Sequence, residues 1–307
     1  VVPYIGDHPL AVLGPLHIER LYSELSESGR RRPSKKAGAG QAGLSPRTIL
    51  HVHRVLSQCL KDAKRLRVIP DNPAVDVKRR RIRKGKATSA AELHVLPLDR
   101  MLALFDRIRA ANLKSVPHAL AVLAFDSGAR RGELLALRWS DVDLDGCTLR
   151  IDRTVDETKA HGVTIKPEPK NESSRRTITL SAETITTLRA WRTRQLEDRL
   201  KLGAHLPADA LIFPVSIETP TEPIRPRNVT KAFSWLVARE GFAGFRFHDF
   251  RHSCASHMLA GGVPVTEVAR HLGHSSAQVT MTVYAHAIPT GDGGMGLLDR
   301  LMGAAEG

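Results

Sequence analysis

The chain has 307 residues, 42% of them hydrophobic, which is enough for two domains with cores of their own. No apolar run approaches the ~20 residues that cross a bilayer, and no signal-peptide pattern opens the chain, so no membrane protein is expected. The net charge of +14 favours a polyanionic partner, nucleic acid first, over a merely basic enzyme. Three scattered cysteines, Cys59, Cys147 and Cys254, provide no disulfide framework and indicate a reducing environment such as the cytoplasm.

The first 80 residues contain two helical patterns. Apolar residues recur at helical spacing over residues 18–25, and Gly29 ends that helix. A second helix has Ser45 as its N-cap and ends at the prolines that begin with Pro70. We therefore expect a small, helical and basic first domain.

A basic run, VKRRRIRKGK, covers residues 77–86, and the small-residue stretch ATSAAE follows it. So little apolar content predicts an exposed linker between two domains, over residues 81–92. Such a run is often only solvated, but between basic domains it can also follow a phosphate backbone. The candidate DNA contacts are Arg79, Arg80, Arg81, Arg83 and Lys84.

Residues 93–307 predict a larger domain that is mostly helical. Alternating and β-branched residues over 147–156, 161–168 and 174–180 predict one small antiparallel sheet. Ser181 is the expected N-cap of a helix that runs to about residue 202. The other expected helices cover residues 99–111, 117–143, 228–241 and 247–259, with two short ones after them. The fold class is therefore mainly α with a small antiparallel β-sheet.

A calcium-binding pattern occurs at the start of this sheet. Asp141, Asp143, Asp145 and Gly146 have the spacing of an EF-hand loop, with Asp152 at the twelfth position. Such a loop requires a bidentate glutamate at that position and a helix on each side. Here the following residues alternate like a strand, which favours a turn from a helix into a hairpin.

The stretch FHDFRHSCASHML is rich in groups that bind ions. His248 and His252 are four positions apart, so a helix would place them on one face, as in a zinc site. Zinc needs a third ligand and usually a carboxylate, and Arg251 between the histidines would repel a cation. A guanidinium beside imidazoles suits a phosphate instead, because its planar fork matches two phosphate oxygens. A helix with structural histidines is the third interpretation of this segment taken alone.

Three other segments carry side chains suited to a phosphate, and a fourth carries a tyrosine. SGARRGELLALRW has Arg130 at a helix start, where backbone amides also favour anions. PKNESSRR has Lys170 at the tip of an expected hairpin, HLGHSS has His274, and TVYAH has Tyr284. In chain order the segments supply Arg, Lys, His-x-x-Arg, His and Tyr.

This order of residue types resembles the tyrosine recombinase, or phage integrase, family. The resemblance is most specific in SGARRGELLALRWSDVD, HDFRH, LGHSS and YAH, and it is weaker before residue 90. It implies a helical core-type DNA-binding domain over residues 1–80 and a catalytic domain with a C-terminal tail over 93–307. Together they would form a C-shaped clamp on double-stranded DNA. Ser127 stands where the family commonly has Thr, and VVPYIGDHPL resembles the segment after the family's first helix, so that helix is expected to be missing.

The resemblance implies a site-specific DNA recombinase that cleaves and rejoins strands through a 3′-phosphotyrosyl intermediate. Tyr284 would attack the phosphate, His248 would accept the phenol proton, and Lys170 would protonate the leaving 5′ oxygen. No metal, ATP or other cofactor is expected, because arginines neutralise the charge and the phosphotyrosyl ester conserves the bond energy.

Three further members of the implied catalytic set hold the phosphate. Arg130 and Arg251 would neutralise the charge that builds on its oxygens, and His274 would donate a hydrogen bond to one of them. Glu133 would brace the catalytic pocket. The supporting residues are Glu133, Asp249 and His252.

The resemblance also implies a homotetramer that synapses two recombination sites and exchanges strands through a Holliday junction. Residues 290–307 are expected to form a glycine tether and a short apolar segment that docks on its own domain or on a neighbouring protomer. A type IB topoisomerase, a non-catalytic DNA-binding module and a metal-dependent nuclease are the alternatives. A relaxation assay, compared with a two-site recombination assay, distinguishes the topoisomerase from the recombinase. The DNA-binding module does not need Tyr284 with five matched partners, and the nuclease needs a carboxylate cluster that the sequence does not supply.

Overall fold

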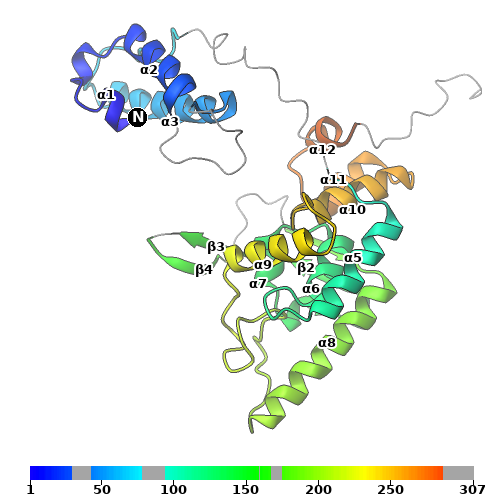
Figure 1. Cartoon of the computed structure of the whole chain (residues 1–307). Helices are drawn as coiled ribbons and strands as arrows, with labels where there is room; N and C mark the ends of the chain where they lie inside the picture. The colour runs from blue at the N-terminus through cyan, green and yellow to red at the C-terminus, as the bar shows by residue number, and fades with distance from the viewer. Residues whose placement is uncertain (30–42, 78–93, 159, 167–174, 286–307) are drawn as a thin grey trace, which may run out of the picture. The chain divides into compact units, whose positions relative to one another are not determined.

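The computed structural model describes residues 1–29, 43–77, 94–158, 160–166 and 175–285. The chain divides into two compact units, Val1–Glu92 and Leu93–Gly307. Among the described residues, helix is the main secondary structure of both units, and the larger unit also holds two small antiparallel sheets (Figure 1). The predicted class, mainly α with a small antiparallel β component, is confirmed. Among the helices in the described part of the chain, none is long and apolar enough to cross a membrane.

The smaller unit is built on two helices that pack through their apolar stripes. Its elements are α1 (Val2–Ile5), a 3-10 turn (Leu10–Val12), α2 (Pro15–Ser28) and α3 (Pro46–Arg65). Ile18, Leu21 and Leu25 of α2 lie in one buried cluster with Leu60 of α3. Inside this core the hydroxyl of Tyr22 is hydrogen-bonded to His53 Nδ1 at 2.8 Å.

The second predicted helix begins as expected and ends early. The Ser45 side chain accepts a hydrogen bond from the amide of Thr48 at 3.2 Å, so the predicted N-cap is confirmed. The helix ends at Arg65 rather than at Pro70, because the chain turns through Arg67, which has a left-handed φ of 59°.

The larger unit is organised around the buried helix α6, against which α5, α8 and α10 pack. Its helices are α5 (Leu98–Ala111), α6 (His118–Ser127), α7 (Arg131–Ala136), a 3-10 turn (Trp139–Asp141), α8 (Ala182–Lys201), α9 (Pro226–Arg239), α10 (Asp249–Ala260), α11 (Val265–Leu272) and α12 (Ala277–Tyr284). The predicted N-cap Ser181 accepts from the amide of Thr184 at 3.2 Å. Figure 1 shows α10, α11 and α12 gathered at one end of this unit, while α8 extends away from them.

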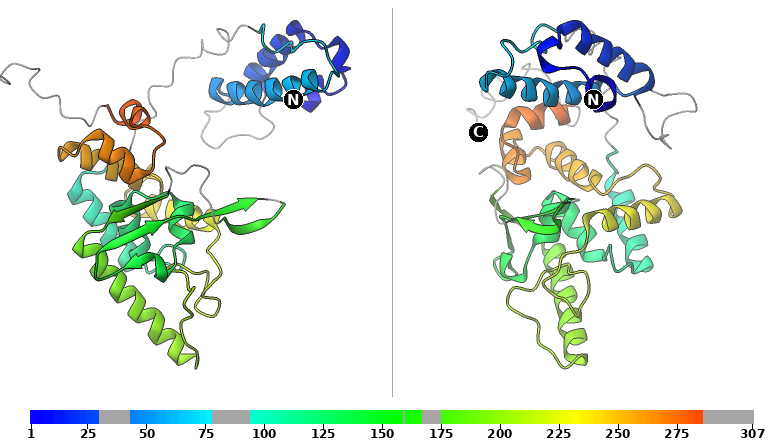
Figure 2. Two further views of the ribbon diagram at one scale, coloured as in Figure 1. Left: turned by 180° about the vertical axis from the view of Figure 1, so that it is seen from behind. Right: turned by 90° about the vertical axis from the view of Figure 1, so that its left-hand side faces the viewer.

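The strands within the described residues form two sheets rather than the single sheet that the sequence predicts. One has the order β1 (Val142–Asp143), β2 (Thr148–Ile151), β5 (Arg176–Thr179), and the other pairs β3 (Thr154–Thr158) with β4 (Gly162–Lys166). The predicted strand over 147–156 is broken after Ile151, because Arg153 turns back to pair with Asp141 at 2.5 Å. The β3–β4 hairpin therefore projects from the body of the unit (Figure 2).

The aspartates of the calcium-like pattern have other partners. Asp141 is buried and pairs with Arg153, while Asp143 Oδ1 accepts from the amides of Asp145 and Gly146 at 3.1 and 2.8 Å. β1 and β2 flank this turn as an antiparallel pair. The predicted turn from a helix into a hairpin is confirmed.

The segment predicted as helical over 117–143 is divided at Gly128, just before the helix start that the sequence indicates at Arg130. This residue ends α6 with a φ of +55°, a conformation that only glycine adopts without a steric cost. A Cβ at this position would lie 2.6 Å from Cδ2 of Leu272 on α11 and 3.1 Å from Sγ of Cys254 on α10. The bare glycine lets α6 approach both helices closely, and α7 starts in a new direction with Arg130 as its N-cap.

Replacing Gly128 by alanine is expected to destabilise the larger unit by more than about 2 kcal/mol, because backbone strain adds to the lack of space for a methyl group. Gly203→Ala is the matched control: Gly203 has a φ of +67° but open space around an added Cβ, so only strain of about 1–2 kcal/mol applies. Urea unfolding followed by tryptophan fluorescence measures both, because all three tryptophans belong to this unit. Equal losses in the two variants would contradict the packing argument.

Candidate active site

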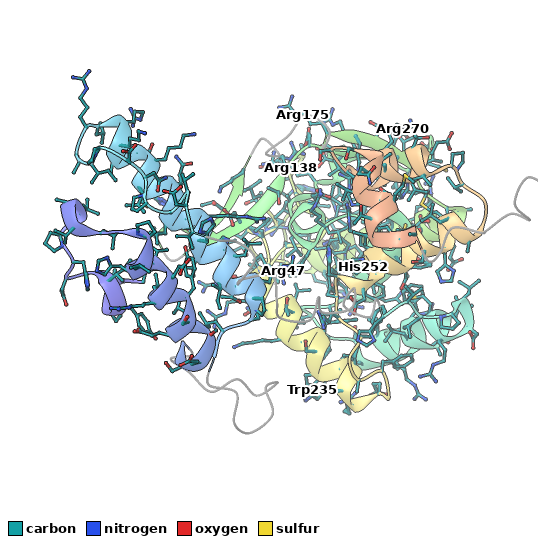
Figure 3. All side chains as sticks on the ribbon, turned by 90° about the horizontal axis from the view of Figure 1, so that it is seen from above. Arg47, Arg138, Arg175, Trp235, His252 and Arg270 are labelled. Atoms are coloured by element: carbon teal, nitrogen blue, oxygen red, sulfur yellow. The ribbon has the colours of Figure 1, made fainter. Side chains whose placement is uncertain are left out.

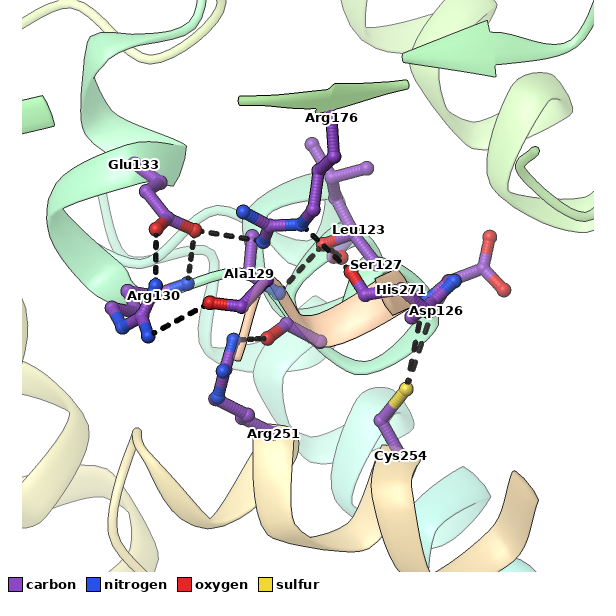
Figure 4. Close-up of polar contacts among 12 residues, drawn as sticks. Leu123, Asp126, Ser127, Ala129, Arg130, Glu133, Arg176, Arg251, Cys254 and His271 are labelled. Atoms are coloured by element: carbon purple, nitrogen blue, oxygen red, sulfur yellow. Dashed lines mark hydrogen bonds and ion pairs between the residues drawn. The ribbon is translucent and has the colours of Figure 1, made fainter. Parts of the chain in front are cut away.

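A buried carboxylate joins two arginines from distant parts of the sequence. Glu133 Oε1 accepts from Arg130 Nη1 at 2.8 Å, and its Oε2 accepts from the Arg130 amide and from Arg176 Nη2, each at 2.9 Å (Figure 4). Glu133 stands in the first turn of α7, so its reach back to the Arg130 amide also caps that helix. Arg176, at the start of β5, additionally donates from Nε to the carbonyl oxygen of His271 at 2.7 Å.

Glu133 stays ionised in this position. Burial raises the pKa of its carboxyl group, but the charge and hydrogen bond of Arg176 and the hydrogen bonds from Arg130 outweigh that effect. The net result is a pKa below the ordinary value for glutamate. In this geometry one anion, Glu133, bonds two cationic side chains, Arg130 and Arg176.

Arg251 is held by a backbone carbonyl group rather than by Glu133. It is 3% exposed, and its Nη1 donates to the carbonyl oxygen of Gly128 at 2.7 Å (Figure 4). Within the described residues its other terminal nitrogen, Nη2, is buried without a hydrogen-bond partner. Burial first, and repulsion from Arg130 next, lower the pKa of Arg251 to about 10. A buried guanidinium with an unused donor beside other cations is an arrangement that an anion would stabilise.

Helix α10 fixes Arg251 through the residue before it. Phe250 is fully buried, and its ring centroid lies 5.3 to 5.6 Å from those of Phe233, Phe245 and Phe247. This aromatic packing anchors the first turn of the helix. Asp249 accepts from the amide of Arg246 at 2.7 Å and so braces the loop that enters α10.

The LGH segment brings His274 to the arginines through a helix C-terminus. Gly273, with a φ of +68°, ends α11, and the amide of His274 closes on the carbonyl oxygen of Ala269 at 2.9 Å, the pattern of a Schellman cap. The Gly273 carbonyl oxygen accepts from Arg130 Nη2 at 3.3 Å. Burial first, then Arg251 and Arg130, lower the pKa of His274 to about 4, which makes its imidazole neutral at pH 7.

His248 and His252 face each other at the start of α10. His248 is the N-cap residue rather than a member of the helix, and the two ring centroids lie 5.0 Å apart with the rings nearly perpendicular. Desolvation, followed by His252 and Arg251, lowers the pKa of His248 to about 4, although the residue stays exposed. In the part of the chain that the structure describes, no group of three or more His, Cys, Asp or Glu side chains is arranged to hold a metal ion.

The side chain of Tyr284 is buried inside the larger unit. It is 1% exposed and packs with Leu259, Val268 and Leu272, while its hydroxyl is hydrogen-bonded to His252 Nδ1 at 2.8 Å. Burial raises the pKa of the phenol to about 12, against the attraction of Arg251. The imidazole in contact with the tyrosine is thus His252, not His248.

Five of the six predicted catalytic residues meet at this end of the larger unit. Arg130, His248, Arg251, His274 and Tyr284 are linked to one another by the bonds and electrostatic effects given above. Lys170 lies outside the described residues. The candidate DNA contacts of the linker, Arg79, Arg80, Arg81, Arg83 and Lys84, lie outside them as well.

Arg176 was missed by the sequence-based prediction. A signal for it exists, since β5 alternates between buried and exposed positions and Arg176 falls in the buried phase with Ile178. A cation on the inward face of a strand needs an anionic partner. Arg175 and Arg270, labelled in Figure 3, line an open pocket of about 360 Å³ with Arg176 and His274, so the cationic surface extends beyond the residues predicted.

The chain is similar to known proteins both in sequence and in fold. The chain is 34% identical over 178 residues to the tyrosine recombinase XerC-like protein of Caldanaerobacter subterraneus subsp. tengcongensis, covering 56% of this chain and 46% of that one. It is 26% identical over 255 residues to the ICEBs1 integrase of Bacillus subtilis, covering 81% of this chain and 64% of that one. The chain therefore spans about half to two thirds of the length of these relatives.

Among solved structures, the Tn1549 transposon integrase in complex with a circular intermediate DNA superposes with a TM-score of 0.72 at 18% identity, over 95% of this chain and 87% of that one. At that identity the likeness shows the fold. The sequence model of the Phage integrase family matches residues 94–290, which include every residue of the site described above. The chain belongs to the phage integrase family.

Proposed function

We propose that this protein is a site-specific DNA recombinase that cleaves and rejoins strands through a 3′-phosphotyrosyl intermediate, without a metal ion or a nucleotide cofactor. The observation that carries the proposal is the buried, incompletely bonded guanidinium of Arg251 beside Arg130 and His274, within electrostatic reach of Tyr284. Few ligands other than a phosphate offer an anion with enough oxygens for three such donors.

The cationic side chains stabilise the transition state more than the ground state. A phosphodiester carries one negative charge, and attack on it places further charge on the non-bridging oxygens. Arg130 and Arg251 are already fixed, by Glu133 and by the Gly128 carbonyl, so they need little reorganisation when that charge develops. Neutral His274 adds a hydrogen bond without adding repulsion among the cations.

Tyr284 must leave its stored position to react. A phosphate cannot reach a phenol that is 1% exposed and packed against Leu259 and Leu272. We propose that DNA binding draws the end of α12 out of this core, and that His252 holds the hydroxyl only in the stored state. His248, exposed and neutral, then accepts the phenol proton.

The partner is double-stranded DNA that carries recombination sites, and the protein acts on it in the cytoplasm of a bacterial cell. The smaller unit and the linker arginines also bind the duplex, and four protomers synapse two sites. The net charge of +14 and the arginine-lined pocket beside His274 support a nucleic-acid partner.

Tyr284→Phe is expected to bind DNA with unchanged affinity yet to form no covalent adduct, because the nucleophilic oxygen is gone. A nicked suicide substrate that traps cleaved complexes, run on a denaturing gel, measures the adduct. Tyr22→Phe is a matched control, since Tyr22 makes the same 2.8 Å bond to an imidazole inside the smaller unit. An SDS-stable protein–DNA band from Tyr284→Phe would overturn the nucleophile assignment.

Substitutions of His248 and His252 are expected to slow DNA cleavage to different extents. His248→Ala should slow adduct formation by roughly 100-fold to 10,000-fold, the range typical of a lost general base. His252→Ala should stay within about tenfold of the wild type, because the bond that it removes belongs to the stored state. Single-turnover kinetics measure the cleavage rate of each variant. If His252→Ala lost more of the wild-type rate than His248→Ala, the two roles would be reversed.

Lys170→Ala is expected to cleave ordinary DNA poorly and to recover on a substrate whose 5′-bridging oxygen is replaced by sulfur, because a thiolate leaves without being protonated. Lys166→Ala is the control: Lys166 lies on β4 and pairs with Asp156 at 2.5 Å, so it should cleave both substrates at wild-type rates. EDTA should leave wild-type cleavage unchanged. If sulfur brings no selective recovery, Lys170 does not act as the acid.

A further inference from the structure

A buried threonine contacts the imidazole that faces the arginines. Thr280 lies on α12 one turn before Tyr284, and it is fully buried. Its Oγ1 lies 2.7 Å from Nδ1 of His274. The contact joins the segment that carries the tyrosine to the LGH segment.

The direction of this hydrogen bond follows from the hydroxyl's need for an acceptor. A buried hydroxyl left without an acceptor costs about 1–3 kcal/mol. Exposed Thr282, on the same helix, donates to the carbonyl oxygen of Gln278 at 2.8 Å. Thr280 makes no such bond to its own helix, and within the described residues His274 Nδ1 is its hydrogen-bond partner. The hydroxyl proton therefore points to Nδ1, and Nδ1 is the acceptor.

An imidazole that accepts at Nδ1 and is neutral carries its proton on Nε2. His274 is neutral at pH 7, because burial and the neighbouring Arg251, Arg130, Arg176 and His252 lower its pKa to about 4. A neutral imidazole has a single N–H group, so the tautomer decides whether Nε2 donates or accepts a hydrogen bond. A phosphate oxygen only accepts, and the opposite tautomer would present it with a lone pair.

We propose that Thr280 is a positioning residue that donates its hydroxyl proton to His274 Nδ1 and so holds the imidazole in the tautomer with Nε2–H available to a phosphate oxygen. The role on phosphate rests on the proposed recombinase function, whereas the tautomer does not. Hydrogen-bonded partners of metal-binding histidines fix the tautomer and the orientation of the ring in the same way.

Long-range ¹H–¹⁵N correlation spectra of the free protein, labelled at histidine, report the tautomer directly. His274→Gln identifies the His274 signals by their loss. We expect a protonated Nε2 and a bare Nδ1 in the wild type and in Thr280→Ser. Thr280→Val, which keeps the shape and removes the hydroxyl, should show a mixture or the opposite tautomer. A proton on Nδ1 in the wild type, or an unchanged tautomer in Thr280→Val, would overturn the proposal.

Cleavage of the nicked suicide substrate tests the role on phosphate. Thr280→Val should cleave on the order of 10-fold to 100-fold more slowly, and Thr280→Ser should stay close to the wild type. Thr282→Val, on the same helix but exposed, should change neither the tautomer nor the rate. If Thr280→Val shifts the tautomer but cleaves normally, the donor role is wrong. If the wild type shows the expected tautomer but forms no adduct, the recombinase function fails and the threonine–histidine assignment stands.

Discussion

The site depends on the pair of ionic contacts that Glu133 makes with Arg130 and Arg176. The guanidinium groups of Arg130, Arg176 and Arg251 gather at one end of the larger unit, and those of Arg176 and Arg251 are buried. Their mutual repulsion would separate α7, β5 and α10 if nothing compensated for it. A single ionised carboxylate bonds Arg130 and Arg176 and also draws on Arg251 through space. The cationic cluster is stable because one buried anion bonds two of its members.

Two helix C-termini supply the remaining compensation. Gly128 ends α6 and Gly273 ends α11, both in the left-handed conformation, and each presents its carbonyl oxygen to an arginine of the site. Carbonyl groups at the end of a helix carry partial negative charge and have no partner within the helix. Each glycine thus ends a helix and also orients an arginine through its carbonyl oxygen: Gly128 orients Arg251, and Gly273 orients Arg130. Packing and electrostatics depend on the same backbone positions.

Tyr284 and the groups proposed to bind phosphate differ in how far the structure has already positioned them. The arginines are bonded in place and the imidazole of His274 is neutral, so this part of the site is formed before any substrate is present. Tyr284 lies in a hydrophobic cluster with its hydroxyl bonded to His252 and its pKa raised to about 12. A phenol in that condition is a poor nucleophile. Under the proposed function, the groups that bind the anion are formed in advance, whereas attack on it requires Tyr284, at the end of α12, to move.

The sequence by itself determined the local features and a list of candidate site residues. Ser45 and Ser181 as N-caps follow from rules that act over three or four residues, and the spacing of Arg130, His248, Arg251, His274 and Tyr284 matched a family pattern. Only the tertiary structure decided which of these groups touch. Arg176 reaches Glu133 across 43 positions and Tyr284 reaches His252 across 32. The break that assigns β2 and β3 to different sheets also depends on a distant pair, Arg153 with Asp141. Periodicity and capping report only neighbours along the chain, whereas charge pairing and burial depend on distances that folding alone creates.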